Sequence, residues 1–348
     1  MSPHPTKFAP MLAAPAARLP EQLDGWTIEP KWDGVRVIAE ATERSARLWT
    51  RNGNDKAPQF PEIVEALRAL AAEHGRFVLD GEIIALDARG RAQRFQALQG
   101  RVHAESEETR ARHAKSTRTA LVAFDLLFDG DRALTALPWT ERRKALEALV
   151  PTRRAAVVRR GESVRCGSAA ARRLFDRARA EGWEGVLLKR VDAPYAVGRR
   201  TPDWRKVKLE REQEFVIGGF TAPTQGAARD HLGALLVGYY DVHGRLRYAG
   251  KVGTGYTASM LALLARKLAP LSRAVSPFVD APRSSARSTT WVKPTLVAQV
   301  RYNEITDAGI LRQPSFLGLR DDKDARDVRL ESTESASGAV TNGLRCAS

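Results

Sequence analysis

A short segment near the start of the chain combines the residue types of a nucleophilic site. In residues 29–36, EPKWDGVR, Lys31 lies between two acids, Glu29 and Asp33, and Arg36 completes the pattern K-x-D-G-x-R. A lysine amine becomes a nucleophile when its neighbours lower its pKa, so this spacing is typical of covalent catalysis by lysine. The alternative is a hairpin that turns at Asp-Gly and leaves the lysine in solvent.

Further groups with chemical potential follow in order along the chain. They add carboxylates, an aromatic ring and a pair of lysines. Their order favours the catalytic interpretation of Lys31. They are Arg51-Asn52-Gly53, Asp80-Gly81-Glu82, Phe124-Asp125, Glu184-Gly185-Val186-Leu187 and Trp204-Arg205-Lys206-Val207-Lys208.

Periodic patterns predict the elements that position these groups. Strand patterns occupy residues 26–39, 77–87, 121–128 and 185–189, and helical spacing occupies residues 60–74, 140–149 and 168–181. Beyond residue 209 the chain changes to short strands with glycine-rich turns, at 214–220, 235–241 and 246–252, which is typical of a small barrel or meander. We therefore predict a flexible N-terminus (1–6), a mixed domain (7–210), a β domain (211–330) and a disordered tail (331–348).

The composition narrows the class of partner. The 348 residues include 56 Lys and Arg against 41 Asp and Glu, a net charge of +15, with 43% hydrophobic residues. Such a chain buries ordinary cores and presents a basic surface, which favours nucleic acid. Two cysteines and six scattered histidines argue against a disulfide framework or a zinc site. No long apolar run supports membrane insertion or secretion, so we expect a cytoplasmic protein without a membrane partner.

The ordered motifs resemble those of the covalent nucleotidyltransferases, which include DNA ligases, RNA ligases and mRNA capping enzymes. The resemblance covers residues 8–330. Within this superfamily the chain most resembles the ligase domain of bacterial ligase D, an end-joining ligase. The narrower match rests on PMLA at 10–13, LRYAGKVGTGY at 246–256 and FLGLRDDKDARDV at 316–328. The resemblance implies an α+β nucleotidyltransferase (adenylation) domain followed by an all-β OB-fold domain.

The resemblance implies that ATP adenylates Lys31 and that Lys206 and Lys208 contact the α-phosphate. At pH 7.5 a lysine with the ordinary pKa near 10.4 is neutral in about one molecule in a thousand, so activation is worth roughly 4 kcal/mol. We expect the charges of Lys206 and Lys208, with Mg²⁺, to lower the pKa of Lys31. The alternative for both lysines is an exposed basic strand end.

The same resemblance implies the remaining contacts. Glu82 would hold the ribose hydroxyls, and Phe124 would stack on adenine with Leu187 on the other face; the alternative for Phe124 is a core residue. Mg²⁺, for which Mn²⁺ can substitute, is expected at Glu184, joined by Asp33 and Glu82. The other nucleotide contacts expected are Glu29, Arg36, Arg51, Arg200 (or its neighbour Arg199), Arg320 and Lys323, with help from Arg312.

The predicted function is an ATP-dependent DNA ligase that joins a 5′-phosphate to a 3′-hydroxyl through lysyl-AMP, in DNA repair or end joining. The alternatives are an RNA ligase, a GTP-using capping-type enzyme and a non-catalytic nucleic-acid clamp. The expected setting is the bacterial cytoplasm, at the nucleoid, with a monomer acting on nicked or broken duplex DNA. A Ku-type partner, and the choice between a stand-alone protein and a piece of a larger one, stay open. The segment Arg229-Asp230-His231 departs from the family's loop, which leaves its DNA contacts open as well.

Overall fold

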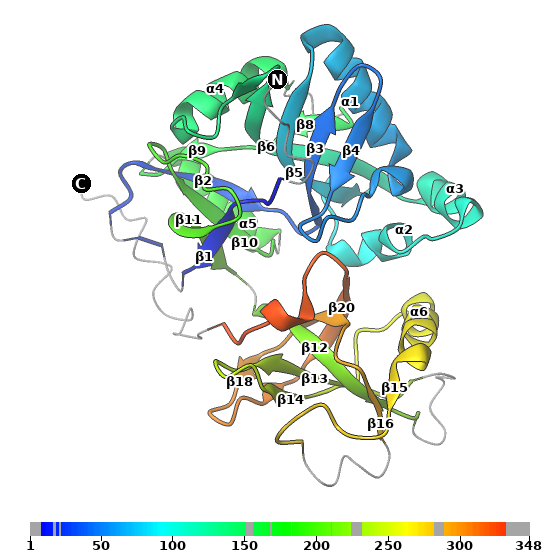
Figure 1. Ribbon diagram of the computed structural model, residues 1–348. Coiled ribbons are helices and arrows are strands. Elements are labelled where there is room, and N and C mark those ends of the chain that lie inside the picture. Colours follow the sequence, from blue (N-terminus) through cyan, green and yellow to red (C-terminus); the bar gives the residue numbers. More distant parts are fainter. Residues whose placement is uncertain are drawn as a thin grey trace. The chain divides into compact units, whose positions relative to one another are not determined.

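The computed structural model describes residues 8–16, 19–20, 22–150, 156–167, 169–181, 183–209, 211–223, 232–281 and 289–331. These residues form two compact units that divide between Glu210 and Arg211 (Figure 1). The predictions for residues 1–6, for Arg229-Asp230-His231 and for 332–348 lie outside the described residues.

The first unit is built on two sheets. One has the strand order β1-β11-β10-β2-β9, and the other has the order β4-β3-β5-β6-β7, with β8 parallel to β6. The strands of the first sheet are β1 (Leu12–Pro15), β2 (Trp26–Lys31), β9 (Val164–Arg165), β10 (Gly185–Arg190) and β11 (Arg200–Lys208). Those of the second are β3 (Val35–Ala41), β4 (Ala46–Trp49), β5 (Phe77–Leu86), β6 (Arg118–Asp129), β7 (Arg132–Ala133) and β8 (Val158–Arg160).

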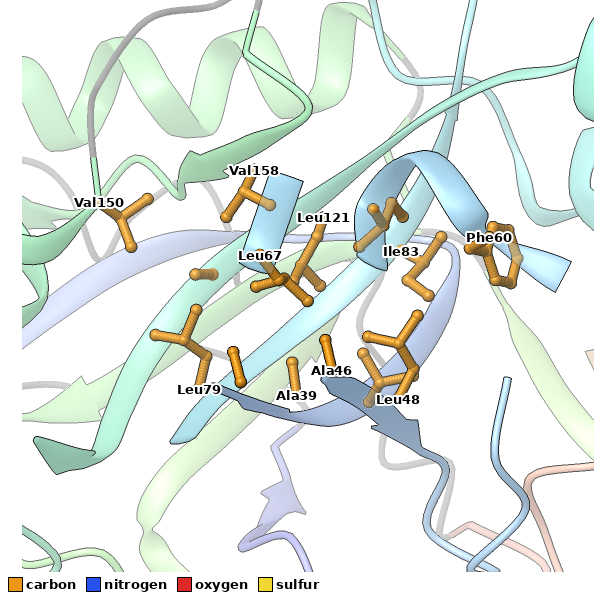
Figure 2. Packing of buried hydrophobic residues seen from close by; sticks show 14 of the residues in the cluster. Ala39, Ala46, Leu48, Phe60, Leu67, Leu79, Ile83, Leu121, Val150 and Val158 are labelled. Atoms are coloured by element: carbon orange, nitrogen blue, oxygen red, sulfur yellow. The ribbon is translucent and has the colours of Figure 1, made fainter. Parts of the chain in front are cut away.

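Helices cover the outer faces of both sheets. The α-helices are α1 (Pro61–His74), α2 (Gln99–Val102), α3 (Glu107–Ser116), α4 (Trp139–Leu149) and α5 (Ala169–Ala180), and the 3₁₀ turns are η1 (Ala57–Gln59) and η2 (Phe95–Leu98). Figure 2 shows Leu67 of α1 packed over Leu79, Ile83 and Leu121 of the second sheet. Leu67 has no exposed surface, so its truncation to alanine would cost about 2–5 kcal/mol.

The inner faces of the two sheets meet each other. Ile38 and Phe124 of the second sheet share one buried cluster with Trp204 of the first. On the outer face of the first sheet, Ile28 and Leu188 pack with residues of α5. Because side chains alternate along a strand, one set of residues anchors each sheet to its helix and the other set lines the space between the sheets.

The segment from 26 to 39 is not one strand, and β2 and β3 do not pair as a hairpin. The two strands belong to different sheets, and Trp32, Asp33 and Gly34 connect them. At Gly34 the backbone passes so close to β5 that an added Cβ would lie 2.0 Å from the carbonyl oxygen of Ile83. A glycine is therefore required where the chain crosses between sheets.

The second unit consists mainly of strands. Its sheet has the order β14-β13-β12-β16-β15, and β17 pairs with both β12 and β20. Its elements are β12 (Glu212–Thr221), β13 (Leu235–Tyr240), β14 (Leu246–Val252), α6 (Ala258–Leu268), η3 (Ala269–Leu271), β15 (Ser272–Arg273), β16 (Thr289–Val292), β17 (Val297–Arg301), β18 (Glu304–Ile305), β19 (Leu311–Arg312), β20 (Ser315–Arg320) and η4 (Ala325–Asp327). The core lies between the strands and α6, where Phe215, Val237 and Leu264 are buried together.

Candidate functional site

Lys31 and Glu184 meet although 153 positions separate them. Lys31 is the last residue of β2, and Glu184 directly precedes β10. The antiparallel register of these strands places Gly185 opposite Lys31, so the two side chains meet at the sheet end. The Nζ of Lys31 donates a hydrogen bond to Oε2 of Glu184, whose side chain is only 6% exposed.

Lys208 extends the same row of residues. The registers of β2 with β10 and of β10 with β11 align Lys31, Gly185 and Lys208 across three strands. A Cβ at Gly185 would lie 2.2 Å from the carbonyl oxygen of Val207, so the central position of the row holds no side chain. The two lysines therefore flank a glycine on one face of the sheet.

The charges around Lys31 act in opposite directions. Burial lowers the pKa of Lys31 and the charge of Lys208 lowers it further, but the charge and hydrogen bond of Glu184, with a smaller effect of Glu82, outweigh both. The net pKa is raised above its ordinary value. This differs from the expectation that neighbouring cations lower it, because the sequence did not reveal the direct contact with Glu184.

The next row of the sheet carries Glu29, Leu187 and Lys206. Glu29 is buried and forms an ion pair of 2.8 Å with Lys189, whose side chain is fully buried. Lys189 also donates to the carbonyl oxygen of Phe124 at 3.2 Å. Oε1 of Glu29 has no hydrogen-bond partner among the described residues, so a buried acceptor is left for a ligand.

The sequence analysis did not identify Lys189 as a candidate site residue. Its Nζ lies 4.7 Å from the centre of the Phe124 ring and 4.3 Å from that of Trp204. The available signal was a lysine at an alternating position within the otherwise apolar strand 185–189. Phe124 and Leu187 come from opposite sheets and belong to the same inner cluster, as an adenine sandwich requires.

Arg36 is held by a buried network. Its guanidinium forms a two-point ion pair with Asp80, at 2.9 and 2.6 Å. Asp80 also accepts a hydrogen bond of 2.7 Å from the hydroxyl of Tyr195. Arg36 lies 5.5 Å from the centre of the Phe124 ring. Burial opposes the charge of Arg36, but Asp80 outweighs burial and the pKa of Arg36 is raised. Arg36 thus helps to position the ring of Phe124.

The carboxylates near Lys31 suit a minimal magnesium site. Among the described residues, no three His, Cys, Asp or Glu side chains form a ready metal cage. Glu184 contacts Lys31, and the charge of Glu82 helps to raise the pKa of Lys31. Oδ2 of Asp33, in contrast, accepts a hydrogen bond of 3.1 Å from the backbone N–H of Phe95. Mg²⁺ is often held by one or two carboxylates together with phosphate and water, so Glu184 and Glu82 fit this ion better than Asp33 does.

Two family models match most of the chain. Residues 10–208 match the ATP dependent DNA ligase domain, and residues 228–323 match the ATP dependent DNA ligase C terminal region. The chain belongs to the ATP-dependent DNA ligases. Its first unit is the nucleotidyltransferase domain and its second is the OB-fold domain.

Individual relatives agree with this assignment. The chain is 39% identical over 322 residues to the multifunctional non-homologous end joining protein LigD of Mycobacterium bovis, covering 92% of this chain and 39% of that protein. It is 32% identical to DNA ligase C1 of Mycolicibacterium smegmatis, covering 85% and 83%. The solved mycobacterial DNA ligase D, complexed with ATP and MES, is 38% identical, with a TM-score of 0.63 and coverage of 94% and 99%. The chain thus spans about two fifths of the length of its LigD relatives.

The remaining arginines predicted to contact the nucleotide in this ligase domain lie outside the row of Lys31, Gly185 and Lys208. Arg51 lies in the turn after β4. Arg200 begins β11 and donates to the carbonyl oxygen of Ala13. A bulge in β11 places Arg200 and Lys206 opposite Leu12 and Pro15 of β1, so the two residues are about 10 Å apart along the sheet. Arg199, the neighbour of Arg200, is exposed. Arg200 therefore contacts β1 and does not belong to the row of Lys31.

The cations predicted in the OB-fold domain have partners within that domain. Arg320 binds Asp322 at 2.8 and 2.7 Å, and Lys323 binds Glu214 at 3.1 Å. A third cation, Arg312, pairs with Glu304 at 2.8 Å. In the described part of the ligase chain, no helix has both the length and the apolar character needed to cross a bilayer.

Proposed function

We propose that this chain joins a 5′-phosphate to a 3′-hydroxyl in duplex DNA, using ATP and a lysyl-AMP intermediate on Lys31. The observation that carries the proposal is the row of Lys31, Gly185 and Lys208 with Glu184 at its end. It combines a half-buried amine, a carboxylate that holds it and a cation for the phosphate, with no side chain between the two lysines.

In the first step the amine of Lys31 attacks the α-phosphorus of ATP. Because Glu184 raises the pKa of Lys31, the ammonium group of Lys31 first gives a proton to solvent. The free amine then forms a phosphorus–nitrogen bond, and the bond to pyrophosphate breaks as pyrophosphate leaves. Glu184 orients Nζ through their hydrogen bond, while Lys208 and Lys206 stabilise the negative charge on the α-phosphate. Mg²⁺, held by Glu184 and Glu82, would neutralise phosphate charge when bound.

Base recognition follows from the buried pair Glu29–Lys189. Lys189 occupies Oε2 of Glu29 and leaves Oε1 as an acceptor. The exocyclic amine of adenine is a donor that matches Oε1, whereas guanine has a carbonyl oxygen at that position and would place two acceptors together. This favours ATP over GTP, with Phe124 and Leu187 on the two faces of the base and Glu82 on the ribose.

In the later steps AMP passes to the 5′-phosphate, and the 3′-hydroxyl displaces it. The charge of +15 suits duplex DNA and implies binding that weakens with salt. The relatives named for end joining support DNA breaks as the substrate and DNA repair as the role. We further propose a monomer in the bacterial cytoplasm, at the nucleoid, with a Ku-type end-binding protein as a candidate partner.

The test is covalent labelling followed by sealing. Lys31→Ala should lose the adduct formed with labelled ATP and keep its fold, because Lys31 is not a core residue. Lys144→Ala, an exposed lysine on α4, is the matched control and should label normally. A normal adduct in Lys31→Ala, or labelling by GTP in preference to ATP, would contradict the proposal. The adenylated protein should then seal a nicked duplex.

A further inference from the structure

The first unit contains a cavity of about 410 Å³ whose lining includes the sequence neighbours of Lys31 and Glu184. Trp32, which follows Lys31, and Trp183, which precedes Glu184, form two of its walls, while Lys31 and Glu184 do not line it. The ring centroids of the two tryptophans are 6.1 Å apart and their planes are inclined by 32°. A cavity of this size accommodates a small ligand, and its aromatic walls offer a stacking surface.

Positive charge dominates the lining of this cavity. Two glutamates are also present, and both are engaged. Glu162 is ion-paired with Arg177, and Glu181 accepts a hydrogen bond of 3.0 Å from the indole N–H of Trp183. Arg91 is likewise paired with Asp87 at 2.7 Å, so the excess of positive charge that a ligand meets comes from Arg159 and Arg160. The arginines of the lining are Arg91, Arg159, Arg160 and Arg177.

Arg160 shows why an anion would be stabilised here. Burial and the charge of Arg143 lower the pKa of Arg160, and Glu147, whose Oε1 lies 3.9 Å from Nε, offsets them only in part. The charged form of the Arg160 guanidinium is thus less stable here than it would be in water. A phosphate oxygen would compensate through its charge and through charge-assisted hydrogen bonds.

The two aromatic walls have supporting contacts from neighbouring side chains. Trp32 packs on a cluster that includes Ile84 and Val122, and the guanidinium of Arg177 lies 5.2 Å from the centre of the Trp183 ring. Because both rings have supporting contacts, less side-chain entropy is lost when a ligand stacks on them. Arginine with an aromatic ring is the combination that binds the phosphate and the base of an unpaired nucleotide.

We propose that this cavity binds one nucleotide, with the base against Trp32 and Trp183 and the phosphate on the arginines. A free nucleoside triphosphate and an unpaired nucleotide of a DNA strand both offer this chemistry. The cavity lies outside the residues proposed to hold ATP, so its occupant is a second nucleotide beside the one that reacts with Lys31.

Paired variants of the full chain test this site. Arg160→Gln removes the cation and Arg160→Lys retains it, while Trp183→Leu removes the ring and Trp183→Phe retains it. Arg44→Gln, at an exposed turn between β3 and β4, controls for the loss of one positive charge. Two measurements are made on each variant: the anisotropy of a short labelled oligothymidylate, and the fluorescence of etheno-ATP, each with inorganic phosphate as a competitor.

We expect Arg160→Gln and Trp183→Leu each to weaken binding about tenfold, the range observed when a stacked base or a charged hydrogen bond is lost. The conservative variants and Arg44→Gln should retain most of the affinity. A loss for the oligonucleotide alone identifies a DNA strand as the source, and a loss for etheno-ATP alone identifies the free nucleotide. Unchanged binding of both ligands in Arg160→Gln and Trp183→Leu would overturn the proposal. Adduct formation on Lys31, measured in parallel, reports on the proposed ligase function separately.

Discussion

The buried pair Glu29–Lys189 allows a stability test whose size follows from the structure. The side chain of Lys189 is 0% exposed and that of Glu29 is 4% exposed, with 2.8 Å between Nζ and Oε2. Lys189→Met keeps the length of the side chain and its apolar contacts with Phe124 and Trp204, but removes the charge. Because a buried carboxylate then loses its partner, we expect the free energy of unfolding of this domain to fall by about 3–5 kcal/mol.

The double variant Glu29→Leu/Lys189→Met isolates the interaction energy between the two charges from the effect of each change alone. Replacement of both charges by apolar side chains is often neutral, so the double variant should lie within about 1–2 kcal/mol of the wild type. If Glu29→Leu costs as much as Lys189→Met, the two single changes together amount to about 6–10 kcal/mol, so their effects should fail to add by at least about 4 kcal/mol. Hydrogen exchange of the β2 and β10 amides is the suitable assay, because the chain has two units and the exchange reports on each region separately.

Additive effects of the two single changes would refute this reasoning, since they would show that the charges do not stabilise each other. Lys144→Met, an exposed lysine on α4, controls for the loss of one charge and should change exchange little. The same variants test nucleotide recognition. If Lys189 positions Glu29 for the base, Lys189→Met should raise the ATP concentration for half-maximal adduct formation more than it lowers the rate at saturation.

Three further predictions use other parts of the chain. Glu184→Gln should raise the Mg²⁺ concentration needed for adduct formation while DNA binding survives; equal Mg²⁺ titrations for variant and wild type would count against Glu184 as a ligand. Lys323→Ala should impair adduct formation and spare the sealing of a nick that already carries 5′-AMP; equal losses on both substrates would remove Lys323 from the first step. Burial raises the pKa of the Cys166 thiol to about 12, so its alkylation at pH 8 should be far slower than that of free cysteine, as mass spectrometry of its peptide would show.

Local patterns were sufficient to predict much of the fold. Alternation and helical spacing depend on near neighbours, and the predicted segments 60–74, 77–87 and 140–149 correspond to α1, β5 and α4. The resemblance to DNA ligases, carried by the ordered motifs, was confirmed by the family models and relatives. The assignments of individual site residues stay predictions until variants are measured.

Other features depend on contacts that local patterns do not encode. Residues 26–39 alternate throughout, yet the close approach of Gly34 to β5 divides them between two sheets. The raised pKa of Lys31 depends on Glu184, 153 positions away. The burial of Lys189 likewise depends on Glu29, which belongs to another strand. The last two features follow from the register of β2 with β10, and the first follows from the close approach of two backbones; only the folded chain defines both.

Register also links the stability of the first sheet to its chemistry. Glu29 and Lys31 alternate along β2 with Ile28, which packs toward α5, and Leu187 alternates along β10 with Val186 and Leu188. A slip of one residue would turn these apolar side chains into the space between the sheets and move Glu29 and Lys31 to the other face. The hydrophobic contacts with α5 oppose such a slip, since each buried aliphatic side chain contributes about 1.5–3 kcal/mol. The apolar residues of β2 and β10 therefore fix the position of Lys31, the proposed nucleophile.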